Sequence, residues 1–263
     1  MALFSWRLAG HVAVEHLWAV GAMVALAAAG NVINDYFDQR EDRINKPERA
    51  LVGRVVKRRV VLAEHLGWTV VALGLAAWGS WQQAALWPLV WIVLLGGALT
   101  AYSPWFKRQF LRGNVLIALA VGQLPLWTGA ALEVTSGPGW RVLVAFAVLS
   151  GFLTFIREVT KDVQDAEGDA HWGYDTLAVR WGREKTVRLL GGLSLVSTGL
   201  LVCCTVWWWG QIGFQASWCS AFLLPALVAT RHVMRGNVHR ASAWQKLTLA
   251  GGLVALALAP PVV

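Results

Sequence analysis

The chain has 263 residues, of which 57% are hydrophobic and only 14% are charged. Soluble domains carry about 25% charged and about 45–50% apolar residues, so this composition excludes an ordinary soluble domain. The formal net charge is +8, and its meaning depends on where the basic residues lie along the chain.

Long apolar runs recur through the whole sequence, each close to the roughly 20 residues that a membrane-spanning helix needs. The polar connections between them are too short to bury a core of their own. We therefore expect an all-α, polytopic helical bundle that forms one membrane-embedded domain over 1–263, with cap loops at about 34–58 and 158–187. The predicted spans are eight: about 11–33, 59–79, 84–101, 113–132, 140–157, 188–209, 212–231 and 243–262.

Lys and Arg gather in alternate connections. They number eight in 34–59, three in 107–112, six in 157–188 and four in 231–246, whereas the intervening connections carry almost none. This is the positive-inside pattern, in which the basic loops face the cytoplasm. We expect an integral protein of the cell (inner) membrane with these loops on the cytoplasmic side, and the pattern argues against nucleic acid as a partner.

Two aspartate triplets share one spacing, D-x2-D-x3-D, and each follows a predicted span directly on the same side of the membrane. They are Asp35, Asp38 and Asp42 in the first polar connection, and Asp162, Asp165 and Asp169 about half a chain later. Positions i, i+3 and i+7 share one face of an α-helix. Carboxylates crowded in this way repel one another unless a cation intervenes. Mg²⁺ suits them, because it binds through one or two carboxylates together with substrate phosphates.

The alternative explanation is that the triplets are ordinary solvated helix ends. Asp and Glu total only 15, however, and six of them form the duplicated pattern, which favours a site. Basic residues nearby suit an anionic diphosphate, although each is also explained by the positive-inside pattern; only for Lys161, wedged against the second triplet, is the site favoured. These candidates are Arg43, Lys46, Arg49, Lys107, Arg108, Arg157 and Lys161.

The residues around both triplets resemble a known family. The match is long around the first triplet, from Ala29 to Pro47, and includes Asn34 directly before Asp35. It is similar to the first signature of the UbiA superfamily of intramembrane prenyltransferases, and the second triplet resembles the second signature. The middle loop contributes a further similarity, in Tyr102-Ser103 with Lys107-Arg108.

This resemblance, which extends from about residue 10 to the C-terminus, implies a helical bundle with a central cavity that opens laterally to lipid. It also implies Mg²⁺ as the cofactor and nine spans, with the triplets after the second and sixth. Here they follow the first and fifth visible spans, so we expect that the family's first helix is missing. The implied Mg²⁺–diphosphate ligands are Asn34, Asp38, Asp42, Asp165 and Asp169, with Asp35 and Asp162 as accessory acids.

The implied reaction transfers a prenyl group from a prenyl diphosphate, as the allylic C1–O bond loosens, the acceptor attacks C1 and diphosphate leaves. The run from Gly30 to Arg49 is most similar to the branch that adds a second geranylgeranyl group to geranylgeranylglyceryl phosphate, the digeranylgeranylglyceryl phosphate synthases. Branches that prenylate aromatic acceptors in quinone or pigment biosynthesis, such as hydroxybenzoate or dihydroxynaphthoate, share much of it. An aromatic acceptor therefore stays an alternative.

Two other classes of protein fit less well. Acids within membrane spans mark ion pathways, which would suit an ion or solute transporter. Both triplets, however, lie beyond span ends on one side, whereas transporter sites lie near the midplane. A non-enzymatic scaffold gives no reason for two acidic triplets at matched spacing.

Overall fold

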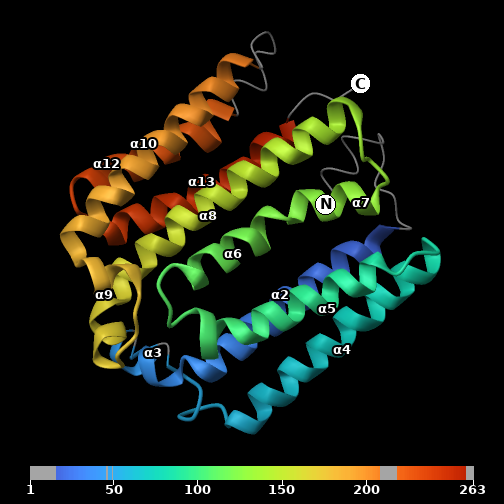
Figure 1. Ribbon diagram of the computed structural model, residues 1–263, viewed down its shortest axis with the longest axis horizontal. Helices are drawn as coiled ribbons and strands as arrows, with labels where there is room; N and C mark the ends of the chain where they lie inside the picture. Colours follow the sequence, from blue (N-terminus) through green and yellow to red (C-terminus); the bar gives the residue numbers. More distant parts are fainter. Residues whose placement is uncertain (1–15, 46, 49, 208–217, 259–263) are drawn as a thin grey trace. The chain divides into compact units, whose positions relative to one another are not determined.

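The computed structural model describes residues 16–45, 47–48, 50–207 and 218–258 (Figure 1). Within these ranges the regular elements are helices, apart from one isolated bridge between Val52 and Val56. The prediction of an all-α fold is therefore confirmed. Contacts divide the described chain into two compact units, which we treat separately. The prediction of one domain over 1–263 stays a prediction.

Six described helices are long and apolar enough to cross a membrane. The expected count of eight spans stays a prediction, because the first and the last three expected spans include residues outside the described ranges. A further apolar helix, Trp218–Met234, is shorter than the six. The six are Leu17–Phe37, Arg58–Gln82, Trp87–Phe106, Arg112–Ala131, Gly139–His171 and Arg183–Cys204.

The N-terminal unit contains the described residues up to Leu116 together with Glu167–Thr176. Its frame is three helices that pack side by side (Figure 1): α2 (Leu17–Phe37), α4 (Arg58–Gln82) and α5 (Trp87–Ala101). Helix α2 presents small, fully covered alanines, which let a neighbouring helix approach closely. A polar contact also ties α2 to α4, since Nδ1 of the buried His65 lies 3.0 Å from the carbonyl oxygen of Ala29.

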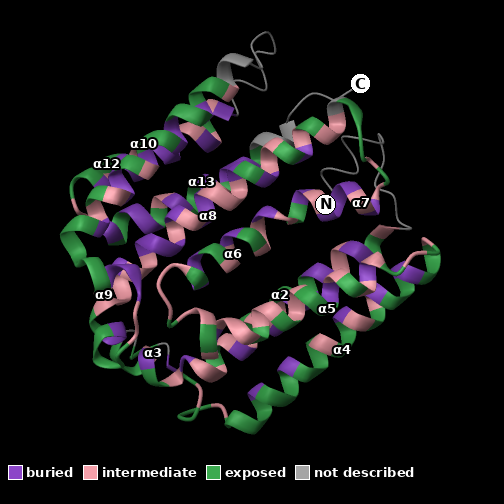
Figure 2. Ribbon diagram, in the orientation of Figure 1, coloured by how far each residue is buried: buried purple, intermediate pink, exposed green. Residues whose placement is uncertain are grey.

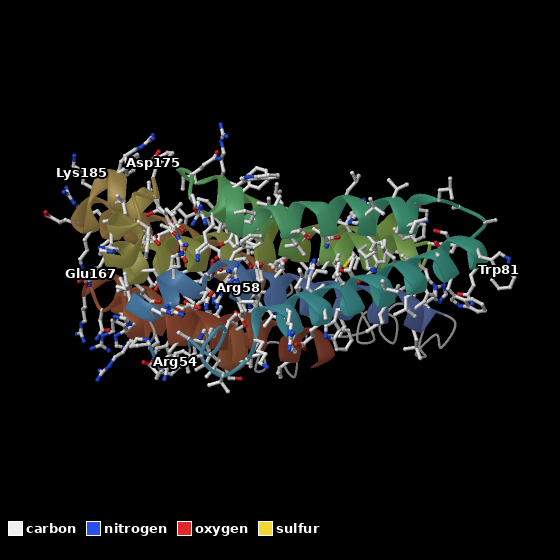
Figure 3. All side chains as sticks on the ribbon, turned by 90° about the horizontal axis from the view of Figure 1, so that it is seen from below. Arg54, Arg58, Trp81, Glu167, Asp175 and Lys185 are labelled. Carbon is white, nitrogen blue, oxygen red and sulfur yellow. The ribbon has the colours of Figure 1, made fainter. Side chains whose placement is uncertain are left out.

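Much of α4 is exposed among the described residues, as the colours of Figure 2 show, and its exposed positions include large apolar residues. Leu66, Val70 and Trp78 are among them, and each is exposed by more than a third. Exposed apolar surface of this extent suits lipid rather than water. Figure 3 shows that Arg54, Glu167 and Asp175 lie toward one end of the N-terminal unit and Trp81 lies at the other.

The C-terminal unit contains Ile117–Ala166 and the described residues from Leu177 onward. Helices α6 (Arg112–Gly122) and α8 (Gly137–His171) each begin or end in the N-terminal unit. Within the C-terminal unit they approach closely where both carry glycine: a Cβ on Gly122 would lie 3.0 Å from the carbonyl oxygen of Ala147, and one on Gly151 3.2 Å from that of Ala118. The remaining helices are α7 (Leu124–Ala131), α9 (Leu177–Trp181), α10 (Arg183–Trp207), the π-helix η3 (Trp218–Leu223), α12 (Leu224–Met234) and α13 (Val238–Leu258).

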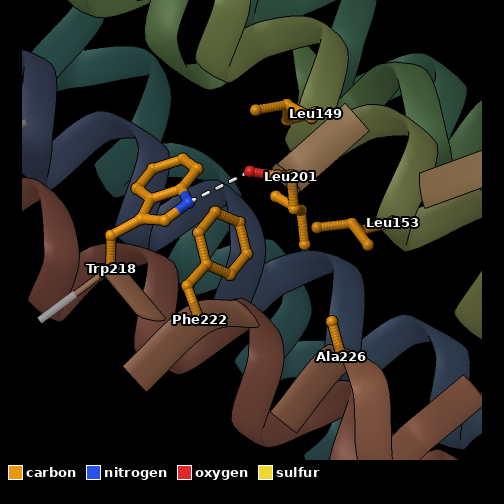
Figure 4. Close-up of a cluster of buried hydrophobic side chains, with 6 residues drawn as sticks. All are labelled: Leu149, Leu153, Leu201, Trp218, Phe222 and Ala226. Atoms are coloured by element: carbon orange, nitrogen blue, oxygen red, sulfur yellow. Dashed lines mark hydrogen bonds between the residues drawn. The ribbon is translucent and has the colours of Figure 1, made fainter. Parts of the chain in front are cut away.

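A buried cluster joins α8, α10 and η3 within this unit (Figure 4). The indole of Trp218 is fully buried against Phe222, and its Nε1 donates a hydrogen bond of 3.3 Å to the carbonyl oxygen of Leu201. A buried indole N–H needs such an acceptor. The cluster fixes the packing of α8, the helix that carries the second aspartate triplet.

Candidate active site

The first triplet lies where α2 meets the short helix α3 (Gln39–Asn45). Helical hydrogen bonding continues through this junction, because the N–H of Asp38 bonds the oxygen of Asn34 at 2.8 Å and the N–H of Asp42 bonds that of Asp38 at 2.9 Å. Asp38 and Glu41 are therefore one turn apart on one face, and both are buried, at 5% and 3% exposure. Asp35 is exposed and Asp42 is half-buried.

Asp38 is held by two donors from different elements. Its Oδ2 accepts a 2.8 Å hydrogen bond from Nδ2 of Asn34 and lies 2.6 Å from Nζ of Lys107. Asn34 is fixed in turn, since its Oδ1 accepts a 2.5 Å hydrogen bond from Oγ of the buried Ser103. The result is a connected polar network at the end of α2.

A π-helix places two members of this network. η2 (Tyr102–Phe106) follows α5 directly, and the N–H of Lys107 closes it with a 2.7 Å bond to the oxygen of Tyr102. Single π-turns of this kind often mark functional sites. Tyr102-Ser103 stood out in the sequence, but Ser103 was not among the predicted site residues, and the structure adds it.

Lys107 is surrounded by negative charge. Burial alone would lower its pKa, but the charge of Asp38 and the hydrogen bond to it, with further contributions from Glu41 and Asp169, outweigh burial and raise the pKa above the usual range for lysine. Lys107 is therefore a fixed ammonium at neutral pH, positioned against the acid that the sequence selects as a metal ligand.

The segment Glu167–Thr176, which includes the last turn of α8, belongs to the N-terminal unit and contacts the residues around Asp38. The hydroxyl of Tyr174 donates a hydrogen bond to Oε1 of Glu41, and the Arg108 guanidinium lies 5.0 Å from the centre of the Tyr174 ring. The N–H of Asp175 donates to the oxygen of Arg108 at 3.0 Å. Asp169, the last acid of the second triplet, is buried in this unit. Sequence reasoning missed the roles of Glu41 and Tyr174.

The rest of the second triplet lies in the C-terminal unit. Asp162 and Asp165 are half-buried on α8, on the same continuous helix as Asp169. One turn earlier the buried Glu158 pairs with two cations, Nη1 of Arg157 at 3.0 Å and Nζ of Lys161 at 2.8 Å. Glu158 thus orients two basic residues that the sequence assigns to the diphosphate.

The remaining predicted basic residues divide into two groups. Arg43 and Arg108 are exposed, and Arg108 is placed by its contact with Tyr174. Lys46 and Arg49 lie outside the described residues. The assignment of all these side chains to a diphosphate stays a prediction.

The residue types at the first triplet fit Mg²⁺. Among the described residues, no three His, Cys, Asp or Glu side chains gather closely enough to hold a metal ion by themselves. Mg²⁺ does not require such a cage, since it usually binds through one or two carboxylates, waters and substrate phosphates. Asp38 already holds a cation, the Lys107 ammonium, and one oxygen of the buried Glu41 has no hydrogen-bond partner among the described residues.

An apolar cavity of about 180 Å³ lies within the N-terminal unit, between α2, α4 and α5. Gly30 and Thr100 line it; Gly30 comes one helical turn before Asn34, and Thr100 three residues before Ser103. The Asn34–Ser103 hydrogen bond therefore lies one turn beyond these lining residues. This places apolar space directly beside the polar network.

Comparison with known proteins agrees with this arrangement. The model of the UbiA prenyltransferase family matches residues 1–258. The digeranylgeranylglyceryl phosphate synthase of Halobacterium salinarum is 34% identical over 248 residues, which cover 91% of this chain and 81% of that protein. The synthase of the same name from Thermococcus kodakarensis is 31% identical over 243 residues, covering 88% and 80%.

Solved structures share the fold. A structure of digeranylgeranylglyceryl phosphate synthase in membranes superposes with a TM-score of 0.69 at 21% identity, over 97% of this chain and 89% of that one. A UbiA homologue from Aeropyrum pernix K1 gives 0.72 at 16% identity over 96% and 93%. One from Archaeoglobus fulgidus, bound to GPP and Mg²⁺, gives 0.64 at 17% identity over 97% and 92%. The chain is an integral membrane enzyme that transfers prenyl groups, and it belongs to the UbiA prenyltransferase family.

Proposed function

We propose that this enzyme transfers a prenyl group from a prenyl diphosphate to geranylgeranylglyceryl phosphate, with Mg²⁺ as cofactor and diphosphate as the leaving group. The similarity over most of the chain to proteins named digeranylgeranylglyceryl phosphate synthase supports this acceptor. The observation that carries the chemistry is the buried carboxylate of Asp38, held by Asn34 and a lysine ammonium one turn from an apolar cavity.

Within the N-terminal unit, Asn34, Asp38, Asp42 and Asp169 are the proposed ligands of the Mg²⁺–diphosphate group, with Asp35 as an accessory acid. In the C-terminal unit, Asp165 is a further proposed ligand of this group and Asp162 a further accessory acid. Bound Mg²⁺ would stabilise the negative charge that develops on the departing diphosphate. Lys107 adds a positive charge that does not depend on metal, because its raised pKa keeps it protonated.

The apolar cavity provides the second requirement of the reaction. When the C1–O bond of the diphosphate loosens, positive charge grows on the prenyl carbon, and water nearby would quench it. Walls that include Leu26, Ile92 and Leu99 keep water from that carbon. The acceptor oxygen then forms its bond to C1, the C1–O bond to diphosphate breaks, and the hydroxyl proton of the acceptor passes to the released diphosphate.

We also propose that the basic loops, and with them the first triplet, face the cytoplasm, and that the chain is one domain of the inner membrane with cap loops at about 34–58 and 158–187. The grouping of Arg54, Glu167 and Asp175 toward one end of the N-terminal unit supports the placement of both cap loops on one side of the membrane (Figure 3), and the positive-inside pattern assigns that side to the cytoplasm. A cysteine introduced for Arg54 should react with a membrane-impermeant maleimide only after the cells are opened. Labelling of this cysteine in intact cells would show that the loop faces the outside of the cell and would contradict the proposed orientation.

The experiment that tests the proposed reaction is an acceptor panel with purified full-length protein in detergent. Labelled geranylgeranyl diphosphate is offered with geranylgeranylglyceryl phosphate, hydroxybenzoate or dihydroxynaphthoate, each with Mg²⁺ and with a chelator. We expect transfer to the glyceryl phosphate alone, and none without Mg²⁺. Transfer to an aromatic acceptor instead would replace the lipid assignment, and equal transfer under chelation would contradict the role of the metal.

A further inference from the structure

The carboxylate of Asp38 already pairs with the ammonium of Lys107, which occupies the place where a metal ion would bind. Nζ of Lys107 lies 2.6 Å from Oδ2 of Asp38. A divalent cation on the same oxygen would stand within a few ångströms of the ammonium, and the two positive charges would repel strongly at this low exposure. Lys107 must therefore leave Oδ2 when a metal binds that oxygen. The Lys107 side chain is only 22% exposed, and a largely covered ammonium that leaves its partner needs another carboxylate, because an unpaired charge away from water is destabilising.

Glu41 offers such a carboxylate. It follows Asp38 by one helical turn and is buried to 3% exposure on the same face. Its two oxygens differ: Oε1 accepts the hydrogen bond from Tyr174, whereas buried Oε2 has no partner among the described residues. A buried acceptor without a donor destabilises the fold. Such a group in a native structure calls for an explanation.

We propose that Oε2 of Glu41 is the acceptor to which the Lys107 ammonium moves when a divalent cation binds Asp38. The inference rests on the proposed role of Mg²⁺. Tyr174 holds Oε1 and so orients the carboxylate, leaving Oε2 for the lysine. The flexible four-carbon stem of lysine lets its head group move between two carboxylates one turn apart. The charge of Glu41 already acts on Lys107 in the present arrangement, where Asp38 acts more strongly.

This exchange assigns Glu41 a role that the D-x2-D-x3-D pattern does not contain. Glu41 is a positioning residue: it acts on the metal through Lys107 and does not touch it. Two other roles make different predictions. A direct metal ligand would matter whether or not Lys107 is present, and a purely structural partner of Tyr174 would not affect metal affinity at all.

A double-mutant cycle separates these roles, because it measures whether two residues act through one another. The full-length protein is titrated with Mn²⁺, which accepts the same oxygen ligands as Mg²⁺, and the free ion is counted by its electron paramagnetic resonance signal. The variants are Glu41→Gln, Lys107→Met and the pair. We expect Glu41→Gln to weaken Mn²⁺ binding about tenfold, a coupling usual within one polar network, and to have no effect in the Lys107→Met background.

Each other outcome decides against the proposal. Equal weakening in both backgrounds would make Glu41 a direct ligand, and unchanged affinity in Glu41→Gln would leave it structural. If Glu41→Gln does not fold, Lys107→Met still tests the first step, in which the ammonium leaves Asp38: it should bind Mn²⁺ more tightly than wild type, since no ammonium competes, and equal or weaker binding overturns the exchange. Glu41→Asp, which keeps the charge on a shorter stem, then replaces Glu41→Gln in the cycle. Wild-type protein that binds no Mn²⁺ even when a prenyl diphosphate is present would contradict the proposed cofactor as well, because Mg²⁺ binds through carboxylates together with substrate phosphates. The two failures can therefore be told apart.

Discussion

The two aspartate triplets have the same spacing but different surroundings. The first crosses the junction of α2 and α3, and partners from η2 and from the end of α8 surround it within one unit. The second lies inside a single 35-residue helix, α8. The buried acid is the middle one in the first triplet, Asp38, and the last one in the second, Asp169. The spacing places the three acids of each triplet on one helix face. The elements that pack against that face determine which of the three acids is buried.

The largest effect that we expect comes from the buried acid of the second triplet, compared with an exposed acid on the same helix. Asp169→Asn should lower the rate of prenyl transfer by about 100-fold or more, the size seen when one charge-stabilising group is lost. Asp169 is buried and acts on Lys107, whereas Glu167, two residues earlier on α8, is exposed. Glu167→Gln is the matched control and should retain wild-type turnover. Equal loss in both variants would remove the distinction between buried and exposed acids.

The ion-pair group before the second triplet predicts a smaller effect on substrate binding. Glu158→Gln should raise the KM for geranylgeranyl diphosphate about tenfold with a smaller change in kcat, because Arg157 and Lys161 lose the carboxylate that orients them; uniform binding losses appear in KM. Glu184→Gln breaks an exposed pair with Arg188, 3.7 Å apart, and should change neither constant. An unchanged KM in Glu158→Gln would mean that these basic residues do not meet the diphosphate.

The contact between α3 and the segment that follows α8 predicts a change in stability. Tyr174→Phe removes the donor to Glu41 and should lower the free energy of unfolding by about 1–3 kcal/mol, since a buried carboxylate loses its partner. Thermal unfolding in detergent measures it. Tyr36→Phe is the control, because its ring stays beneath the Arg58 guanidinium, 4.4 Å away, and its melting temperature should not move. Equal melting temperatures for Tyr174→Phe and wild type would show that the hydrogen bond does not hold the segment.

Much of the fold can be predicted from the sequence, because each membrane helix corresponds to a continuous run of apolar residues. The runs that became α2, α4 and α5 were recognisable by length and hydropathy, and the charges between them gave the expected sidedness. The triplets were equally visible, since D-x2-D-x3-D places acids one or two turns apart on any helix.

The partners of those acids could not be predicted in the same way. Tyr174 meets Glu41 across 133 positions and Ser103 meets Asn34 across 69, so both contacts depend on tertiary packing that no local pattern encodes. The burial of Asp38 but not of Asp35 has the same origin. The three residues that connect to Asp38, directly or through Asn34, come from α2, η2 and the residue after it, and only their packing reveals that they form one network.

Prenyl transfer by Asp38→Ala and Asp165→Ala, measured with excess Mg²⁺ and labelled prenyl diphosphate, shows whether acids of both triplets organise the reacting diphosphate. We expect each variant to fold, as its melting temperature would show, and to lose about 100-fold or more of its turnover. Full activity in either variant would contradict this role of the acids.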